Sequence, residues 1–245
     1  MSSRSMKAKQ LSRSKIDLLN ECPRCFFDDV ALGHVRPPSF PFTLNNAVDS
    51  LLKAEFDVYR REGKPHPLFA TVGLDVVPFA HPELDQWRKN FTGVRWADPV
   101  TGWTFYGAVD DVWVTPEKTL IVADYKATAR RDDLTQANIY PSYQRQVEVY
   151  QYLLEQQGFE VENRAWFVYA NGIPGAARFG DQLSFRTKLL PYDGERGWVV
   201  DAFRQAVALA TGGVRPLAAA ECKWCAYVAG RSIALGRTDS VRRQE

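Results

Sequence analysis

Two carboxylates and a lysine in the middle of the chain have the residue types and spacing of a metal-dependent site. Asp124 and Lys126 stand two residues apart, and Asp110 precedes them. Because side chains two apart on a strand share a face, Asp124 and Lys126 would face one spot. A partner strand could bring Asp110 there as a second carboxylate, and carboxylate oxygens suit Mg²⁺ or Mn²⁺. Such an ion activates water for attack on a phosphodiester, while the ammonium offsets developing charge.

The segments around these residues predict a hairpin inside a larger sheet. Residues 104–114 are rich in β-branched and aromatic side chains, residues 115–118 supply a turn, and residues 119–125 form a second predicted strand. Residues 120–123 are apolar throughout, which is typical of a strand buried on both faces. Charges at its end would emerge at the rim of a central sheet, where sites are common. The alternative is an exposed cross-strand charge pair.

Helical and extended patterns alternate along the rest of the chain. Helices are predicted after Leu11, at residues 43–63, about residues 83–91, at residues 141–157 and at residues 195–211, and strands at residues 161–170 and 183–190. This order favours an α/β or α+β fold with a central mixed sheet.

The order of the polar residues resembles a known superfamily. Gly-x-Val-Asp110, then Val-Ala-Asp124-Tyr-Lys126, then a helix with Gln146-Val-Glu-Val-Tyr150 is similar to the PD-(D/E)XK nucleases, specifically the RecB-type exonuclease branch. The resemblance implies a restriction-endonuclease-like mixed β-sheet flanked by helices. It also implies that Asp110 and Asp124 bind the metal, that Lys126 is catalytic, and that Gln146 and Tyr150 line the site. These two lie one helical turn apart on one face, although that face could equally be a core stripe.

An upstream helix carries a further candidate ligand. Members of this branch often have a Gly-x-x-x-His pattern whose His contacts the metal, and Asp49 takes the His position in the comparable segment, residues 45–52. A carboxylate can bind a hard cation, so Asp49 is either a metal ligand or an acid on the helix surface.

Four cysteines form a second candidate site. Cys22/Cys25 and Cys222/Cys225 are two C-x-x-C pairs, which together supply the four ligands of a tetrahedral zinc or a [4Fe-4S] cluster. Such a clip would join the N- and C-terminal segments of one domain. Iron–sulfur nucleases of the RecB type resemble this layout, but they have one N-terminal and three C-terminal cysteines. No cysteine replaces the last C-terminal one in this chain, so Cys25 would supply the fourth ligand. The resemblance favours [4Fe-4S], the spacing fits zinc equally well, and four independent buried thiols are the alternative.

Length and composition limit the class of protein. A chain of 245 residues that is 45% hydrophobic can bury a sizeable core, which excludes wholesale disorder and coiled coils. We expect a flexible basic tail at residues 1–10, a single nuclease-like domain at 11–230 and a basic tail at 231–245. No apolar run approaches the ~18 residues that span a bilayer, so no membrane association and a cytoplasmic location are expected. A formal net charge of +2 does not by itself reveal a partner.

These patterns predict a metal-dependent DNA nuclease. We expect an exonuclease, or a nuclease acting on single strands or ends, in DNA repair, recombination or CRISPR adaptation. One alternative is a noncatalytic nucleic-acid-binding or assembly module that keeps the fold and a structural metal; another is a zinc protein unrelated to nucleases. The complete set of Asp110, Asp124 and Lys126 counts against the first alternative, because a purely binding protein does not need all three.

Overall fold

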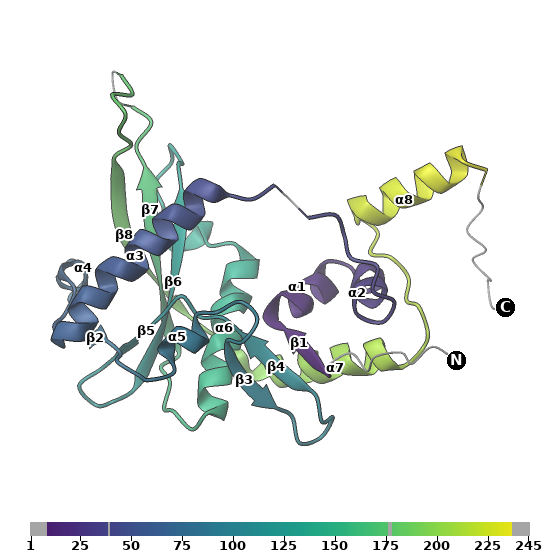
Figure 1. The fold of residues 1–245 in the computed structure, drawn as a ribbon, viewed down its shortest axis with the longest axis horizontal. Helices are drawn as coiled ribbons and strands as arrows, with labels where there is room; N and C mark the ends of the chain where they lie inside the picture. The colour runs from purple at the N-terminus through teal and green to yellow at the C-terminus, as the bar shows by residue number, and fades with distance from the viewer. Residues whose placement is uncertain (1–8, 39, 176–177, 237–245) are drawn as a thin grey trace. The chain divides into compact units, whose positions relative to one another are not determined.

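The computed structural model describes residues 9–38, 40–175 and 178–236 (Figure 1). The chain divides into two compact units, one comprising residues 1–13 and 40–201, the other residues 14–39 and 202–245. The expectation of a single domain at residues 11–230 stays a prediction. Of the two predicted tails, residues 1–8 and 237–245 lie outside the described residues. Among the described residues, no helix has the length and apolar character needed to cross a membrane.

The first unit is built on a five-stranded mixed sheet. Its strand order is β2-β5-β6-β7-β8, with β6 in the centre, parallel to β7, and every other pair antiparallel. The strands are β2 (Val77–Pro78), β5 (Asp111–Val114), β6 (Leu120–Thr128), β7 (Arg164–Gly172) and β8 (Phe185–Asp193). The first six residues of β6 are buried, as its apolar run predicts. The mixed sheet expected from the sequence is therefore confirmed.

A three-stranded sheet accompanies it, in the order β1-β4-β3. Its strands are β1 (Gln10–Ser12), β3 (Val94–Ala97) and β4 (Thr104–Gly107). Gln10 pairs with Thr104, so the last residue of the predicted N-terminal tail lies in a strand. The single strand predicted at residues 104–114 is also wrong, because it is two strands in different sheets. The chain leaves β4 at Gly107, after which the Val109 amide donates to the Trp87 carbonyl instead of extending a ladder.

Two long helices cover the central sheet (Figure 1). Helix α3 (Thr43–Glu62) packs Val48, Leu52 and Phe56 against the sheet side that carries Ile121 and Tyr125. It ends where predicted, because Gly63 adopts a left-handed φ of 63°. Helix α6 (Pro141–Gln156) contacts β6, β3 and β4. The remaining short elements of this unit are α4 (Pro67–Ala70), α5 (Leu84–Trp87, shorter than predicted), η1 (Gln136–Asn138) and η2 (Arg196–Trp198).

The second unit is helical and combines both ends of the chain. It contains α1 (Arg13–Glu21) from its second residue, α2 (Pro23–Val30), most of α7 (Val199–Thr211) and α8 (Lys223–Ala234). Lys15 of α1 forms an ion pair with Asp29 of α2, and an ion pair between Arg215 and Asp28 joins the two chain segments. The last turn of α8 runs through residues 231–234, the first part of the predicted basic tail.

Candidate active site

Strand β6 carries Asp124 and Lys126 on one face, where they form an ion pair. The strand continues to Thr128, beyond the predicted end at Tyr125, so Asp124 lies inside the sheet and not at its rim. Its side chain is fully buried, and neither oxygen accepts a hydrogen bond from any described residue. Buried carboxylates normally have such partners, so these two oxygens are suited to a cation.

Asp110 lies next to Asp124, just before β5. Asp111 pairs with Ala123 in the sheet register, which places Asp110 opposite Asp124 at the mouth of the hairpin. Its Oδ2 accepts a hydrogen bond of 3.0 Å from the Tyr125 amide. Arg88 Nε donates to its backbone carbonyl at 2.9 Å, so both its main chain and its carboxylate are held.

The two carboxylates titrate very differently. Burial raises the pKa of Asp124 to about 7; Lys126 opposes this, and the negative charge of Asp110 adds to it. Burial also acts to raise the pKa of Asp110, but the ammonium groups of Lys53 and Lys126 outweigh it and leave that pKa below its usual value. The two adjacent carboxylates thus stand beside two ammonium groups, and a divalent cation would compete with Lys53 and Lys126 for their oxygens.

Helix α3 brings Asp49 to the same place, together with a lysine that sequence reasoning missed. Lys53 Nζ donates to Asp49 Oδ2 at 2.8 Å and to Asp110 Oδ1 at 3.1 Å. Burial and the charge of Asp110 raise the pKa of Asp49. The spacing of four residues between Asp49 and Lys53 is the signal that could have shown this pair.

Helix α6 completes the surroundings of the lysine. Lys126 Nζ donates to Gln146 Oε1 at 3.3 Å, and Gln146 Nε2 donates to the Tyr150 hydroxyl at 3.0 Å. The ring of Tyr143, which sequence reasoning missed, has its centroid 4.3 Å from Lys126 Nζ. Tyr143 lies one turn before Gln146, on the same helix face, and this spacing was its only signal. A Cβ at Gly107 would lie 2.7 Å from the Tyr150 ring, so glycine is needed there.

A cavity of about 710 Å³ opens onto these groups. Asp49, Asp110, Lys126 and Gln146 line it, whereas the fully buried Asp124 does not. All six residues singled out from the sequence thus lie around one place, since Asp124 contacts Lys126 and Tyr150 contacts Gln146. Their catalytic and metal-binding roles stay predictions.

A buried ionic network lies behind Asp110. Asp111 is fully buried and forms ion pairs with Arg60 and Arg88. It also accepts a hydrogen bond of 2.5 Å from the Tyr125 hydroxyl. Arg88 also donates to the backbone carbonyl of Asp110, and the Tyr125 amide donates to its carboxylate. Asp111 therefore fixes the two residues that position Asp110. Sequence reasoning missed Asp111, whose only signal was its place directly after Asp110.

The four cysteines lie together in the second unit. Their Sγ atoms are all within 4.8 Å of one another, with Cys25 at 3.5 Å from Cys225 and 3.6 Å from Cys222, and Cys22 at 3.8 Å from Cys225. They belong to the same unit and come from its two chain segments, as the predicted clip requires. A zinc ion with Zn–S bonds of about 2.3 Å separates its sulfurs by roughly 3.8 Å in a tetrahedron, so these residues fit such an ion.

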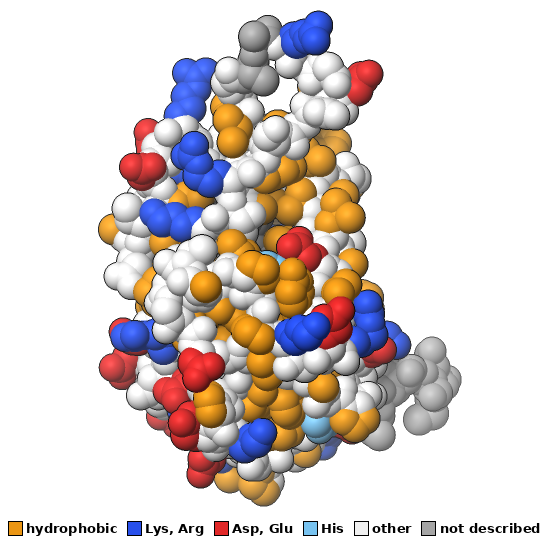
Figure 2. Space-filling view, turned by 90° about the vertical axis from the view of Figure 1, so that its left-hand side faces the viewer, with side chains coloured by type: hydrophobic (Ala, Val, Ile, Leu, Met, Phe, Trp, Pro, Cys, Tyr) orange, Lys and Arg blue, Asp and Glu red, His pale blue; other side chains and the backbone are white. Residues whose placement is uncertain are grey.

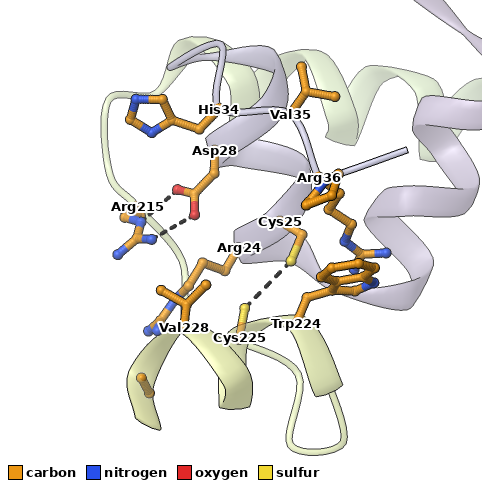
Figure 3. A pocket seen from close by; sticks show the side chains of 12 residues that line it. Arg24, Cys25, Asp28, His34, Val35, Arg36, Arg215, Trp224, Cys225 and Val228 are labelled. Carbon is orange, nitrogen blue, oxygen red and sulfur yellow. Dashed lines mark hydrogen bonds and ion pairs between the residues drawn. The ribbon is translucent and has the colours of Figure 1, made fainter. Parts of the chain in front are cut away.

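A guanidinium group and a backbone amide donate hydrogen bonds to two of the sulfurs. Arg36 donates to Cys222 Sγ at 3.7 Å, and the Ala219 amide donates to Cys22 Sγ at 3.4 Å. Burial opposes ionisation of Cys22, but backbone amides lower the pKa of this thiol to about 6. Figure 3 shows Cys25 and Cys225 facing each other, with Arg36 and Trp224 beside them. A set of four thiols, one of them acidic, is a soft donor set that favours zinc or iron.

Comparison with known proteins shows the superfamily to which the chain belongs. A family model described as "PD-(D/E)XK nuclease superfamily" matches residues 36–229. The solved structure described as "Crystal structure of SSO0001" is 14% identical, with 96% of this chain and 90% of that chain covered and a TM-score of 0.43. No curated protein matches the sequence. Because the family match spans most of the chain, the protein belongs to the PD-(D/E)XK nuclease superfamily.

Proposed function

We propose that the protein is a metal-dependent DNA nuclease whose catalytic centre is formed by Asp110, Asp124 and Lys126. The observation that carries the proposal is the buried Asp124 carboxylate, which accepts no hydrogen bond from a described residue and lies beside both Asp110 and Lys126. A structural ion pair would gain from hydrogen bonds to the remaining lone pairs, whereas a metal ligand must keep them open.

Each residue has a defined task in this proposal. Asp110 and Asp124, with Asp49, would hold Mg²⁺ or Mn²⁺, which when bound supplies an activated water and positive charge at the phosphate. Lys126 would direct its ammonium group at the negative charge that develops on the oxygens of the attacked phosphate. Gln146 accepts a hydrogen bond from that ammonium, and Tyr150 in turn accepts one from Gln146, so both orient Lys126.

The finer assignment rests on the order of these residues. Asp110, Asp-x-Lys and then Gln and Tyr on one helix resemble the RecB-type branch, which supports an exonuclease or a nuclease directed at single strands or ends. We propose DNA repair, recombination or CRISPR adaptation as the process and the cytoplasm as the location.

The cysteine site is proposed to hold a structural metal. The resemblance to iron–sulfur nucleases argues for [4Fe-4S]. The sulfur separations, three of them 3.5 to 3.8 Å and all of them within 4.8 Å, support one zinc ion, because a cluster of four irons placed between the thiolates needs more room than a single ion. The separations favour zinc here.

The test is hydrolysis of DNA by the whole chain with Mg²⁺ or Mn²⁺. End-labelled linear and circular substrates separate attack at ends from internal cleavage. Asp110→Ala and Asp124→Ala should each abolish hydrolysis, whereas the matched control Asp193→Ala, an exposed acid at the far end of β8, should not. Equal activity in all four proteins would refute the site, and binding of DNA without hydrolysis would favour the noncatalytic module.

A further inference from the structure

A second cavity, of about 540 Å³, lies beyond the carboxyl ends of β6 and β7. Four basic side chains line it, namely Arg130, Arg131, Arg186 and Lys188. Two come from the segment that follows β6 and two from β8, the edge strand of the central sheet. Figure 2 shows Lys and Arg side chains (blue) in the upper part of the face that it presents, with Asp and Glu side chains (red) among them, and further Lys and Arg side chains in the lower part. Two acids of the cavity, Asp132 and Asp133, leave a basic excess.

The register of the sheet connects this cavity to the candidate active site. Lys126 on β6 pairs with Tyr169 on β7, and Tyr169 pairs with Lys188 on β8. Residues paired across strands project to the same face of a sheet. Lys188 therefore lies on the face of Lys126, two strand spacings away, which is roughly 10 Å.

The next row of the sheet repeats this relation. Thr128 pairs with Asn171, and Asn171 pairs with Arg186. On each of the three strands, the residue of this row lies two positions from the residue of the first row. Side chains two positions apart on a strand share a face, so both rows project from the same face. Two basic residues of β8 thus share the face on which Asp124 and Lys126 stand.

Hydrogen bonds fix the segment that lines the cavity but do not engage two of its arginine side chains. The Arg130 amide donates to Asn171 Oδ1 at 2.8 Å, and Asn171 Nδ2 donates to the Arg130 carbonyl at 3.0 Å. Lys188 Nζ donates to the Leu134 carbonyl at 2.7 Å. Arg131 and Arg186 are exposed and have no ion-pair partner in the described part of the chain. The segment after β6 is therefore fixed to the sheet, with two guanidinium groups free to bind an anion.

We propose that this cavity binds phosphate groups of the single DNA strand whose scissile bond lies at Lys126. The inference rests on the proposed nuclease function and extends it by a backbone-binding site a few nucleotides from the cut. Arginine forks match the phosphate geometry, and no base contact is needed, so the site would be insensitive to sequence. Tyr169, which lies between Lys126 and Lys188, is buried, so the strand would reach the cavity over the segment that follows β6, which is bonded to Lys188 at Leu134.

The test is binding of a fluorescently labelled single-stranded oligonucleotide, measured by anisotropy without divalent ions across a range of salt concentrations. The doubly substituted Arg131→Ala/Arg186→Ala chain should bind about tenfold more weakly. The slope of log affinity against log salt should fall in magnitude by about 1.4, because each of the two lost phosphate contacts contributes roughly 0.7 to that slope. The matched control is Arg61→Ala/Lys118→Asn, which removes equal charge from two exposed residues, one on α3 and one in the turn between β5 and β6, where Asn tolerates the left-handed backbone.

The outcomes separate this inference from the proposed function. Weaker binding and a smaller salt slope in the first double variant alone support the cavity as a phosphate site. Equal affinity and slope in both double variants overturn it, and the nuclease proposal then stands or falls on metal-dependent hydrolysis by the unaltered chain. No binding of the oligonucleotide by the unaltered chain overturns this inference as well.

Discussion

Replacing Asp124 with Asn should stabilise the metal-free protein relative to the unaltered chain, by an amount that grows as the pH rises. The substitution should also remove the proposed activity. The carboxylate is fully buried, accepts no hydrogen bond from a described residue, and has its pKa raised by burial from 3.8 to about 7. Asn has nearly the same shape and carries no charge. It therefore mimics the protonated acid and escapes the cost of ionising in the sheet.

The size of the effect follows from proton linkage. An unfolded Asp loses its proton near pH 4, whereas folded Asp124 loses it near pH 7, so between these values the folded chain binds more protons and its stability falls as pH rises. Each pKa unit corresponds to about 1.4 kcal/mol, so the full penalty above pH 7 is about 4 kcal/mol. From pH 5 to pH 8, the difference in free energy of unfolding between Asp124→Asn and the unaltered chain should grow by about 2 to 3 kcal/mol in favour of the variant.

Urea unfolding at 25 °C, in buffer freed of Mg²⁺ and Mn²⁺, measures this difference. Tryptophan fluorescence is a suitable signal, because Trp113 and Trp166 lie in the core of the unit that holds Asp124. Added Mg²⁺ should then stabilise the unaltered chain and leave Asp124→Asn unchanged. A gap between the two proteins that is constant from pH 5 to pH 8, or that closes as pH rises, would refute the reasoning.

Three further predictions concern the surroundings of the two sites. The purified chain should be colourless and contain one zinc, which Cys25→Ser should lose; a brown protein with iron and sulfide would contradict this. Gln146→Ala should slow DNA hydrolysis by about ten- to a hundredfold, because Lys126 loses a charged hydrogen bond, and an unchanged kcat would count against that role. Asp111→Ala should lower the free energy of unfolding by about 3 to 5 kcal/mol, measured by urea unfolding, since Arg60 and Arg88 stay buried; a loss under 1 kcal/mol would exclude a structural role.

The central strand and its two charged residues could be predicted because their signals are local. The apolar run before Asp124 indicates a buried strand, and the spacing to Lys126 places both on one face. The end of the long helix at Gly63 is equally local, since a left-handed residue terminates it. Residues whose role follows from their immediate neighbours in the chain can therefore be predicted from the sequence.

The missed residues depend on packing between distant segments. Lys53 belongs to the site only because α3 lies against the sheet, and Tyr143 only because α6 presents that face to Lys126. The break after Gly107 is likewise imposed from elsewhere, by the ring of Tyr150 and by hydrogen bonds with Trp87 and Arg88 at the end of α5. Periodicity in one segment carries no information about such contacts.

The most direct test of the account is DNA hydrolysis by Lys126→Ala with saturating Mn²⁺. If Asp110 and Asp124 hold the ion and Lys126 acts on the phosphate, this variant should still bind Mn²⁺, because both carboxylates remain and a competing ammonium is gone. Its rate of hydrolysis should nevertheless fall by at least about a hundredfold. Hydrolysis at the rate of the unaltered chain would contradict the proposed catalytic centre.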